Sequence, residues 1–196
     1  PSIVIGDSQT GAICKQQGIH RMMRLLLREI LPVVPGSPNT YIDFVPQDSI
    51  AEAIIGLVNH KVVTGEYWLT AGAQALRFSE GLELLVEHAS HLLGKAIPKP
   101  RLMNPAAFDR LIRPVFLPLF PERQQRIFEE SLTFLKYMNM EETFSSSFEQ
   151  LHQQLGITVL PDPRQTAQRS LEYIIGYSSE RRTQAEANIP KEGVSV

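Results

Sequence analysis

Apolar and polar residues alternate between two patterns along the first 95 positions. Short runs rich in β-branched and aromatic residues favour strands. Longer segments, with apolar residues three or four positions apart, favour helices. Expected strands are Pro1–Ile5, Tyr41–Pro46 and Glu66–Thr70, with a short extended piece at Leu31–Gly36; expected helices are 12–30, a helix from Asp48 or Ser49, and Ser79–Gly94. Strands that alternate with helices predict an α/β fold with a largely parallel sheet.

Several residues predict where these helices begin and end. Asp48 or Ser49 is suited to cap the second helix, and Ser49 with Glu52 forms a capping-box pattern. Ser79 is expected to cap the third helix, and Gly94 is expected to end it.

The pattern changes after the proline-rich stretch Ile97–Pro100. Residues 105–140 have helical periodicity that is interrupted at Pro114, Pro118 and Pro121. Between these prolines lies an apolar knot, Phe116–Phe120. Later segments are a loop at Ser145–Ser147, helices over 148–155 and 165–177, and a polar tail from Arg181. We therefore expect three parts: an α/β part (1–95), a mostly helical extension (96–182) and a flexible tail (183–196).

Composition narrows the function classes. The 196 residues carry a net charge of -2, which disfavours a nucleic-acid binder. No apolar run reaches about 18 residues, so no membrane span is expected. Cys14 is the single cysteine, which excludes an internal disulfide and suggests a reducing, cytoplasmic compartment.

Candidate chemistry is sparse. His88 and His91 have helical metal-ligand spacing but no matching third ligand, so no metal is expected. There is no Gly-rich dinucleotide fingerprint and no Tyr-x-x-x-Lys, so no catalytic residue is assigned. Ser8 and Thr10 follow the first strand, where open α/β sheets bind ligands. Capping of the turn by Asp7 and Ser8 explains the same residues equally well.

Three segments together resemble a known family. They are Pro1-Ser2-Ile3-Val4-Ile5-Gly6-Asp7-Ser8-x-Thr10-Gly11, Tyr41–Ile54 with its Asp-x-Val-Pro-x-Asp pattern, and Gly65–Thr70. Their order and spacing resemble the extended short-chain dehydrogenases/reductases, which also include the epimerase/dehydratase type. The Gly-Asp-Ser-x-Thr-Gly form is most similar to the thioester-reductase and fatty-acyl-reductase (male sterility) branch. The resemblance covers residues 1–95 well and the rest loosely.

The resemblance implies the C-terminal part of a Rossmann-type parallel sheet with a substrate-side helical extension. In the family, the nucleotide-binding glycines and the catalytic Tyr/Lys pair precede the segment that matches here. Pro1, Ser2 and Ile3 match the segment beside the nicotinamide of NADP (or NAD). The substrate side is matched by seven residues: Gly6, Asp7, Ser8, Thr10, Gly11, Met22 and Met23. For Met22 and Met23 the alternative is packing in the core, which is the more common role of methionines at helical spacing. Asp43 and Asp48 are expected to be structural.

The first hypothesis is therefore the substrate-binding half of an NAD(P)-dependent oxidoreductase. Its substrate is a small-molecule or carrier-bound acyl thioester, or a related carbonyl. Because the chain opens in a strand, we expect it to be a fragment, inactive and weak in NADPH binding without the N-terminal half.

Two other interpretations stay open. A non-catalytic binding or regulatory module would use the Phe116–Phe120 knot as an interface. A sugar-nucleotide epimerase or dehydratase would share the architecture, and Arg21, Arg24 and Arg28 offer charges for a diphosphate.

Overall fold

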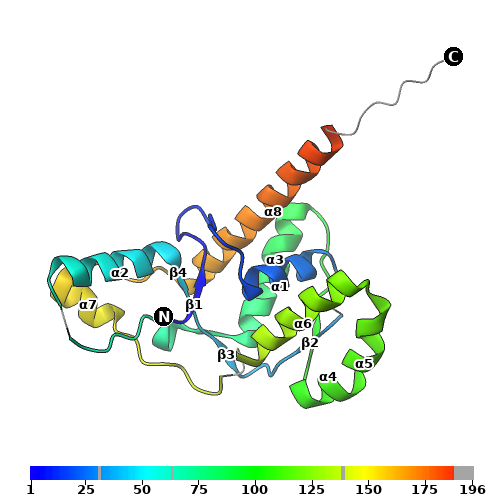
Figure 1. Ribbon diagram of the computed structural model, residues 1–196, viewed down its shortest axis with the longest axis horizontal. Helices are drawn as coiled ribbons and strands as arrows, with labels where there is room; N and C mark the ends of the chain where they lie inside the picture. Colours follow the sequence, from blue (N-terminus) through cyan, green and yellow to red (C-terminus); the bar gives the residue numbers. More distant parts are fainter. Residues whose placement is uncertain (31, 63, 138–139, 188–196) are drawn as a thin grey trace.

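The computed structural model describes the backbone of residues 1–30, 32–62, 64–137 and 140–187. Figure 1 shows the elements, which are, in chain order, β1 (Ile3–Ile5), α1 (Gly18–Leu27), β2 (Val33–Pro35), β3 (Tyr41–Ile42), β4 (Phe44–Pro46), α2 (Gln47–Asn59), η1 (Gly72–Gln74), β5 (Leu76–Arg77), α3 (Phe78–Leu93), β6 (Arg101–Met103), α4 (Pro105–Leu111), α5 (Arg113–Phe116), η2 (Leu117–Leu119), α6 (Glu122–Tyr137), α7 (Phe148–Leu155) and α8 (Pro163–Ala187).

The described strands form three pairs. β1 pairs with β4 and β2 pairs with β6, both in parallel, whereas β3 pairs with β5 in antiparallel fashion. Parallel pairs joined through helices confirm the predicted α/β class. β6 was missed, because its three residues follow a proline-rich stretch that the sequence reading took as a boundary.

The β1–β4 pair separates two apolar clusters. Side chains of neighbouring strand residues point to opposite faces. Phe44 accordingly packs with Ile5 in a cluster shared with α1, α3 and α8. Val45 instead packs in a second cluster with residues of α2 and α7, and Val4 contacts that cluster. All three side chains of β1, and those of Phe44 and Val45 in β4, therefore contribute to one of the two clusters.

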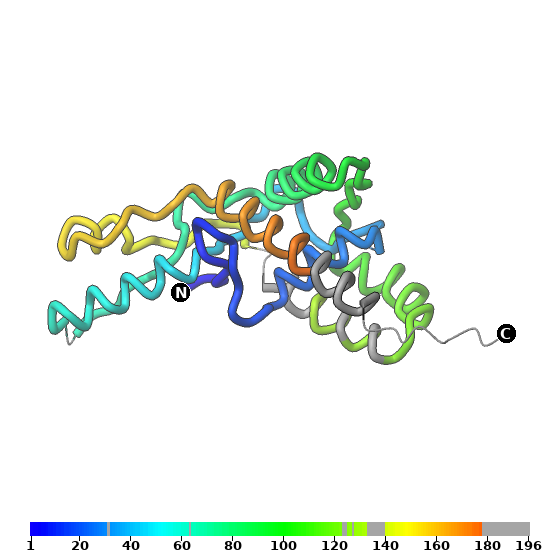
Figure 2. The backbone as a smooth tube through the Cα atoms, turned by 90° about the horizontal axis from the view of Figure 1, so that it is seen from above, coloured from blue at the N-terminus to red at the C-terminus, as the bar shows by residue number. Residues whose placement is uncertain are grey.

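The helices gather on the two sides of this pair. In Figures 1 and 2, α2 and α7 lie side by side at one end of the molecule, while α4, α5 and α6 lie toward the other end. Helix α8 packs against α3, β1 and β4. The first cluster thus includes residues from both sides of position 95, although the predicted division into domains there stays a prediction.

Helix α1 is shorter than the predicted 12–30. The Ala12 carbonyl accepts the Asp7 N–H (N···O 2.9 Å) and the Gln47 Nε2–H (3.0 Å), which holds residue 12 in the preceding loop. The helix begins only at Gly18, and it ends because Glu29 adopts a left-handed φ of 57°. Periodicity alone could not reveal these long-range contacts.

The predicted cap of α2 was wrong. The helix starts directly after β4, with Pro46 at the N-cap position, so Asp48 and Ser49 lie inside its first turn. Glu52 is no capping-box partner, because its carboxylate accepts the backbone N–H and the hydroxyl of Thr158, both at 2.8 Å.

The segment Glu66–Thr70 is not a strand, contrary to prediction. The Leu69 carbonyl accepts the Ser2 N–H (3.0 Å), whereas the Trp68 carbonyl accepts the Ser147 N–H (2.8 Å) from the serine loop at 145–147. The Trp68 N–H donates to Ser147 Oγ (2.9 Å), and the Thr70 hydroxyl donates to the Ser145 carbonyl (2.6 Å). These serine-loop partners take the place of a regular strand neighbour.

Among the later predictions, the end of α3 and the bounds of α7 are confirmed, whereas the cap of α3 and the end of the last helix were wrong. Helix α3 ends at Gly94 in the left-handed conformation, but Arg77 is its N-cap and the Ser79 hydroxyl donates instead to the Pro38 carbonyl (2.9 Å). Helix α7 has the predicted bounds. Helix α8 runs to Ala187, beyond the predicted start of the tail, and residues 188–196 lie outside the described part.

The predicted apolar knot lies in α5 and η2. Its aromatic rings pack on Phe128 of α6, with ring centroids 6.0 Å from Phe128 for both Phe116 and Phe120. The aromatic side chains of the knot therefore pack within the chain, whereas Leu119 is 73% exposed.

Candidate functional site

The loop between β1 and α1 carries most of the predicted substrate residues. Asp7 Oδ1 accepts three hydrogen bonds inside this loop, from the Gln9 N–H (3.1 Å), the Thr10 N–H (2.8 Å) and the Thr10 hydroxyl (2.7 Å). The Thr10 N–H bond, followed by the hydroxyl, lowers the pKa of the Asp7 carboxyl. Asp7 therefore shapes the loop, as the turn-capping interpretation requires.

Two glycines let the loop pack tightly. A Cβ on Gly6 would lie 2.3 Å from the Gly11 carbonyl oxygen, and a Cβ on Gly11 would lie 2.0 Å from the Arg169 carbonyl oxygen of α8. Gly11 also has a φ of 69°. Both positions thus require glycine, and both fix the loop against its surroundings.

Asp48 ties the same loop to α2. Its Oδ1 accepts the Ser8 N–H (2.9 Å) and its Oδ2 accepts the Ser8 hydroxyl (2.5 Å). The structural role expected for Asp48 is confirmed, although through Ser8 and not through a helix cap. Asp7, Ser8 and Thr10 are thus all hydrogen-bonded within the protein, and these bonds hold the loop in one conformation.

The first three residues are predicted to lie beside the nicotinamide. The backbone N–H groups of Ser2 and Ile3 are hydrogen-bonded within the protein. The Ser2 N–H donates to Leu69 and the Ile3 N–H donates to the Asp43 carbonyl (3.3 Å). The Ser2 hydroxyl, in contrast, is buried and has no partner among the described residues. A buried hydroxyl without a partner is uncommon in a folded protein, and the assignment of this segment to the cofactor stays a prediction.

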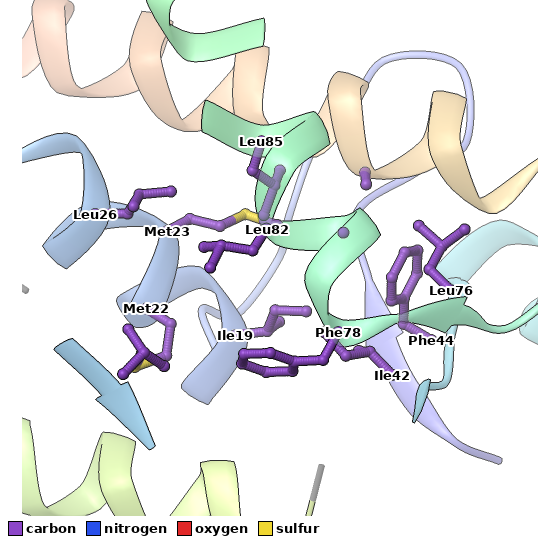
Figure 3. Close-up of a pocket in the computed structure, with 13 residues that line it drawn as sticks. Ile19, Met22, Met23, Leu26, Ile42, Phe44, Leu76, Phe78, Leu82 and Leu85 are labelled. Atoms are coloured by element: carbon purple, nitrogen blue, oxygen red, sulfur yellow. The ribbon is translucent and has the colours of Figure 1, made fainter. Parts of the chain in front are cut away.

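Met22 and Met23, the remaining predicted substrate residues, line an apolar cavity of about 70 Å³. It lies among α1, α3 and the central strands (Figure 3). Its other lining residues are apolar as well: Ile19, Leu26, Val34, Ile42, Phe44, Leu76, Phe78, Gly81, Leu82, Leu85 and Ala167. The cavity therefore suits a hydrocarbon group.

A second cleft, of about 390 Å³, is polar and lies beside β5 and the start of α8. Its cations already have partners, because Arg164 pairs with Glu80 (3.4 Å) and the Arg77 guanidinium lies 5.2 Å from the centre of the Tyr41 ring. We assign this cleft no role.

The other candidate groups have structural partners. His88 Nε2 contacts Glu172 Oε1 (2.9 Å), and no group of three metal-ligating side chains occurs in the described part of the chain. Arg21, a candidate diphosphate ligand, pairs with Glu130, and the Arg24 guanidinium lies 5.6 Å from the centre of the Tyr177 ring. Cys14 is exposed.

The sequence reading missed how Asp43 supports this region. Its buried carboxylate accepts the Ala71 N–H (2.8 Å) and the Gly72 N–H (3.2 Å), which holds the 69–72 segment beside β1 and β4. The sequence predicts only a structural role for Asp43, since no sequence signal identifies partners 28 residues away. Gly81, in the cavity wall, was missed as well.

Comparison with known proteins supports the resemblance. Residues 1–54 match a model of an NAD-binding family, described as "Male sterility protein". Among solved structures, the reductase domain of a nonribosomal peptide synthetase from Mycobacterium tuberculosis is similar, with 16% identity and a TM-score of 0.55. This similarity covers 89% of the present chain but 45% of that structure. None of the curated proteins matches.

These findings confirm the resemblance to the male sterility branch and the α/β fold of a reductase domain. The individual assignments of substrate and cofactor residues stay predictions. In the described part of the chain, no helix is both long and apolar enough to cross a bilayer.

Proposed function

We propose that this chain, whose first 54 residues match the male sterility family, forms the substrate-side part of an NAD(P)-dependent reductase. Its substrate is an acyl thioester or a related carbonyl compound, and NADP is the favoured cofactor because of the branch resemblance. The observation that carries the proposal is the family match over residues 1–54, a segment that includes β1, the loop after it and α1. Residues along α1, among them Met22 and Met23, line the apolar cavity.

In this proposal each part of the segment has a separate task. Residues 1–3, including Ser2, would help to hold the nicotinamide when the cofactor is bound, and the loop at 6–11 would border the reacting carbonyl. Asp48, Gly6 and Gly11 keep that loop rigid, so that the loop loses little conformational entropy when the substrate binds. When bound, the reduced nicotinamide supplies the hydride. The Gly-rich turn and the Tyr/Lys pair would come from another part of the same protein.

Binding of a thioester to the chain tests the proposal. The amide NMR spectrum of the 196-residue chain would be followed while S-butyryl-N-acetylcysteamine is added, with N-acetylcysteamine as the control. We expect saturable shifts at residues 6–11 and in α1 with the thioester only. Equal shifts with both compounds, or no shifts with either, would contradict the proposal.

A further inference from the structure

Gly81 is the residue of the cavity wall that needs explanation. It is buried inside α3, where glycine lowers helix stability relative to alanine. A Cβ at this position would meet only Ile42 Cδ1, at 3.7 Å, which is an ordinary contact. The backbone conformation also admits other residues, because Gly81 lies inside a helix and is not among the described glycines with a positive φ. Neither packing nor backbone geometry therefore requires glycine here.

What the missing side chain does leave is space. Gly81 lines the cavity, so a methyl group at this position would project into a volume of only about 70 Å³. A cavity of about 150 Å³ lined by similar side chains holds benzene. The cavity beside Gly81 has about half of that volume, which is enough for roughly three carbon atoms. One added methyl group would reduce this volume substantially.

The rest of the wall suits a small alkyl group that enters from outside. Met22 and Leu85 line the cavity but are only partly buried, so the cavity approaches the surface between α1 and α3. Met23 lies deeper and is 2% exposed. The labelled side chains in Figure 3 come from both helices and from the strand region, and Met23 lies between Leu26 and Leu82. Unbranched methionine side chains adjust readily to a guest.

We propose that this cavity binds the alkyl end of the acyl substrate and that Gly81 determines the chain length that it accepts. The inference rests on the proposed function, because it names the acyl group of that substrate. A short saturated chain of three carbons beyond the carbonyl fits, and replacement of Gly81 by alanine shortens the accepted chain.

Two thioesters test this inference. The chain, labelled on its methionine methyl groups and amides, would be titrated with the S-acetyl and S-butyryl derivatives of N-acetylcysteamine. We expect the butyryl compound to shift the methyl signals of Met22 and Met23. Gly81→Ala should weaken butyryl binding about tenfold, because the methylene groups of the butyryl chain are no longer buried in the cavity. Binding of the acetyl compound, measured from the amide signals of residues 6–11, should be unchanged.

Gly176→Ala is the matched control. Gly176 also lies within a helix, but it is exposed and a Cβ there would meet nothing within 4 Å. It should gain the same helix propensity and bind both compounds like the wild type. If Gly81→Ala binds butyryl as tightly as the wild type, the inference is wrong while the proposed function stands. If neither compound binds the wild type, the proposed function fails, and the inference with it.

Discussion

A buried histidine should make the stability of this protein depend on pH. His20 in α1 is 1% exposed. Its Nδ1 accepts the Gln17 N–H (3.0 Å), which leaves the proton of the neutral ring on Nε2. Nε2 has no hydrogen-bond partner among the described residues. Burial, and to a smaller extent the charge of Arg24, lowers the pKa of His20 from 6.5 to about 4.

The lowered pKa fixes the sign and the size of the effect. In the unfolded chain the ring takes up a proton near pH 6.5, whereas in the folded chain it does so only near pH 4. The contribution of neutral His20 to stability is therefore complete above pH 6.5 and is lost as the pH falls toward 4. The difference of about 2.5 pH units corresponds to about 3 kcal/mol.

His20→Gln removes the titration and keeps a side chain that can accept the Gln17 N–H, because glutamine is a common residue at this capping position. Urea unfolding would be measured at about pH 7.5 and about pH 4.5. We expect the wild type to lose about 2.5 kcal/mol more than the variant over this interval. His91→Gln, an exposed site in α3, is the control and should behave like the wild type. Equal losses in the wild type and His20→Gln would refute the reasoning.

Three further experiments test the site. Asp43→Asn replaces one of two accepting carboxylate oxygens and should destabilise the fold by about 1–3 kcal/mol, measured by urea unfolding; an unchanged midpoint would contradict this. Gly11→Ala should cost at least about 2 kcal/mol in the same assay, since its Cβ overlaps the Arg169 carbonyl at a positive φ; a soluble variant with wild-type stability would argue against the close packing. Ser8→Ala and Asp48→Asn should be non-additive by about 0.5–3 kcal/mol in a double-mutant cycle, and additive effects would show that the pair is not coupled.

The sequence predicted element types better than their limits. Strand β1, helix α7 and the left-handed end of α3 at Gly94 follow from local patterns, and the structure has them. The start of α1 could not be predicted, because it depends on bonds from Asp7 and Gln47 to the Ala12 carbonyl. The irregular 66–70 segment has strand-like residues, but its partners are the serines at 145–147.

For the site, the family resemblance located the loop and α1 but not the contacts within them. Ser8 was predicted to face a substrate, yet its hydroxyl bonds Asp48, 40 residues away. Met22 and Met23 were predicted from the family resemblance alone, whereas the cavity that they line also needs Phe78, Gly81 and Leu82 of another helix. Only packing of α3 against α1 brings these residues together.

Turnover of a thioester by the complete product of the gene that encodes this chain tests the central claim most directly. Purified protein would be mixed with reduced nicotinamide cofactor, either NADPH or NADH, and with S-butyryl-N-acetylcysteamine. We expect thioester-dependent oxidation of the cofactor, faster with NADPH, with release of N-acetylcysteamine and with butanal or butanol as the reduced product. Cofactor that stays reduced with every thioester, in protein that binds it, would contradict the assignment as a reductase.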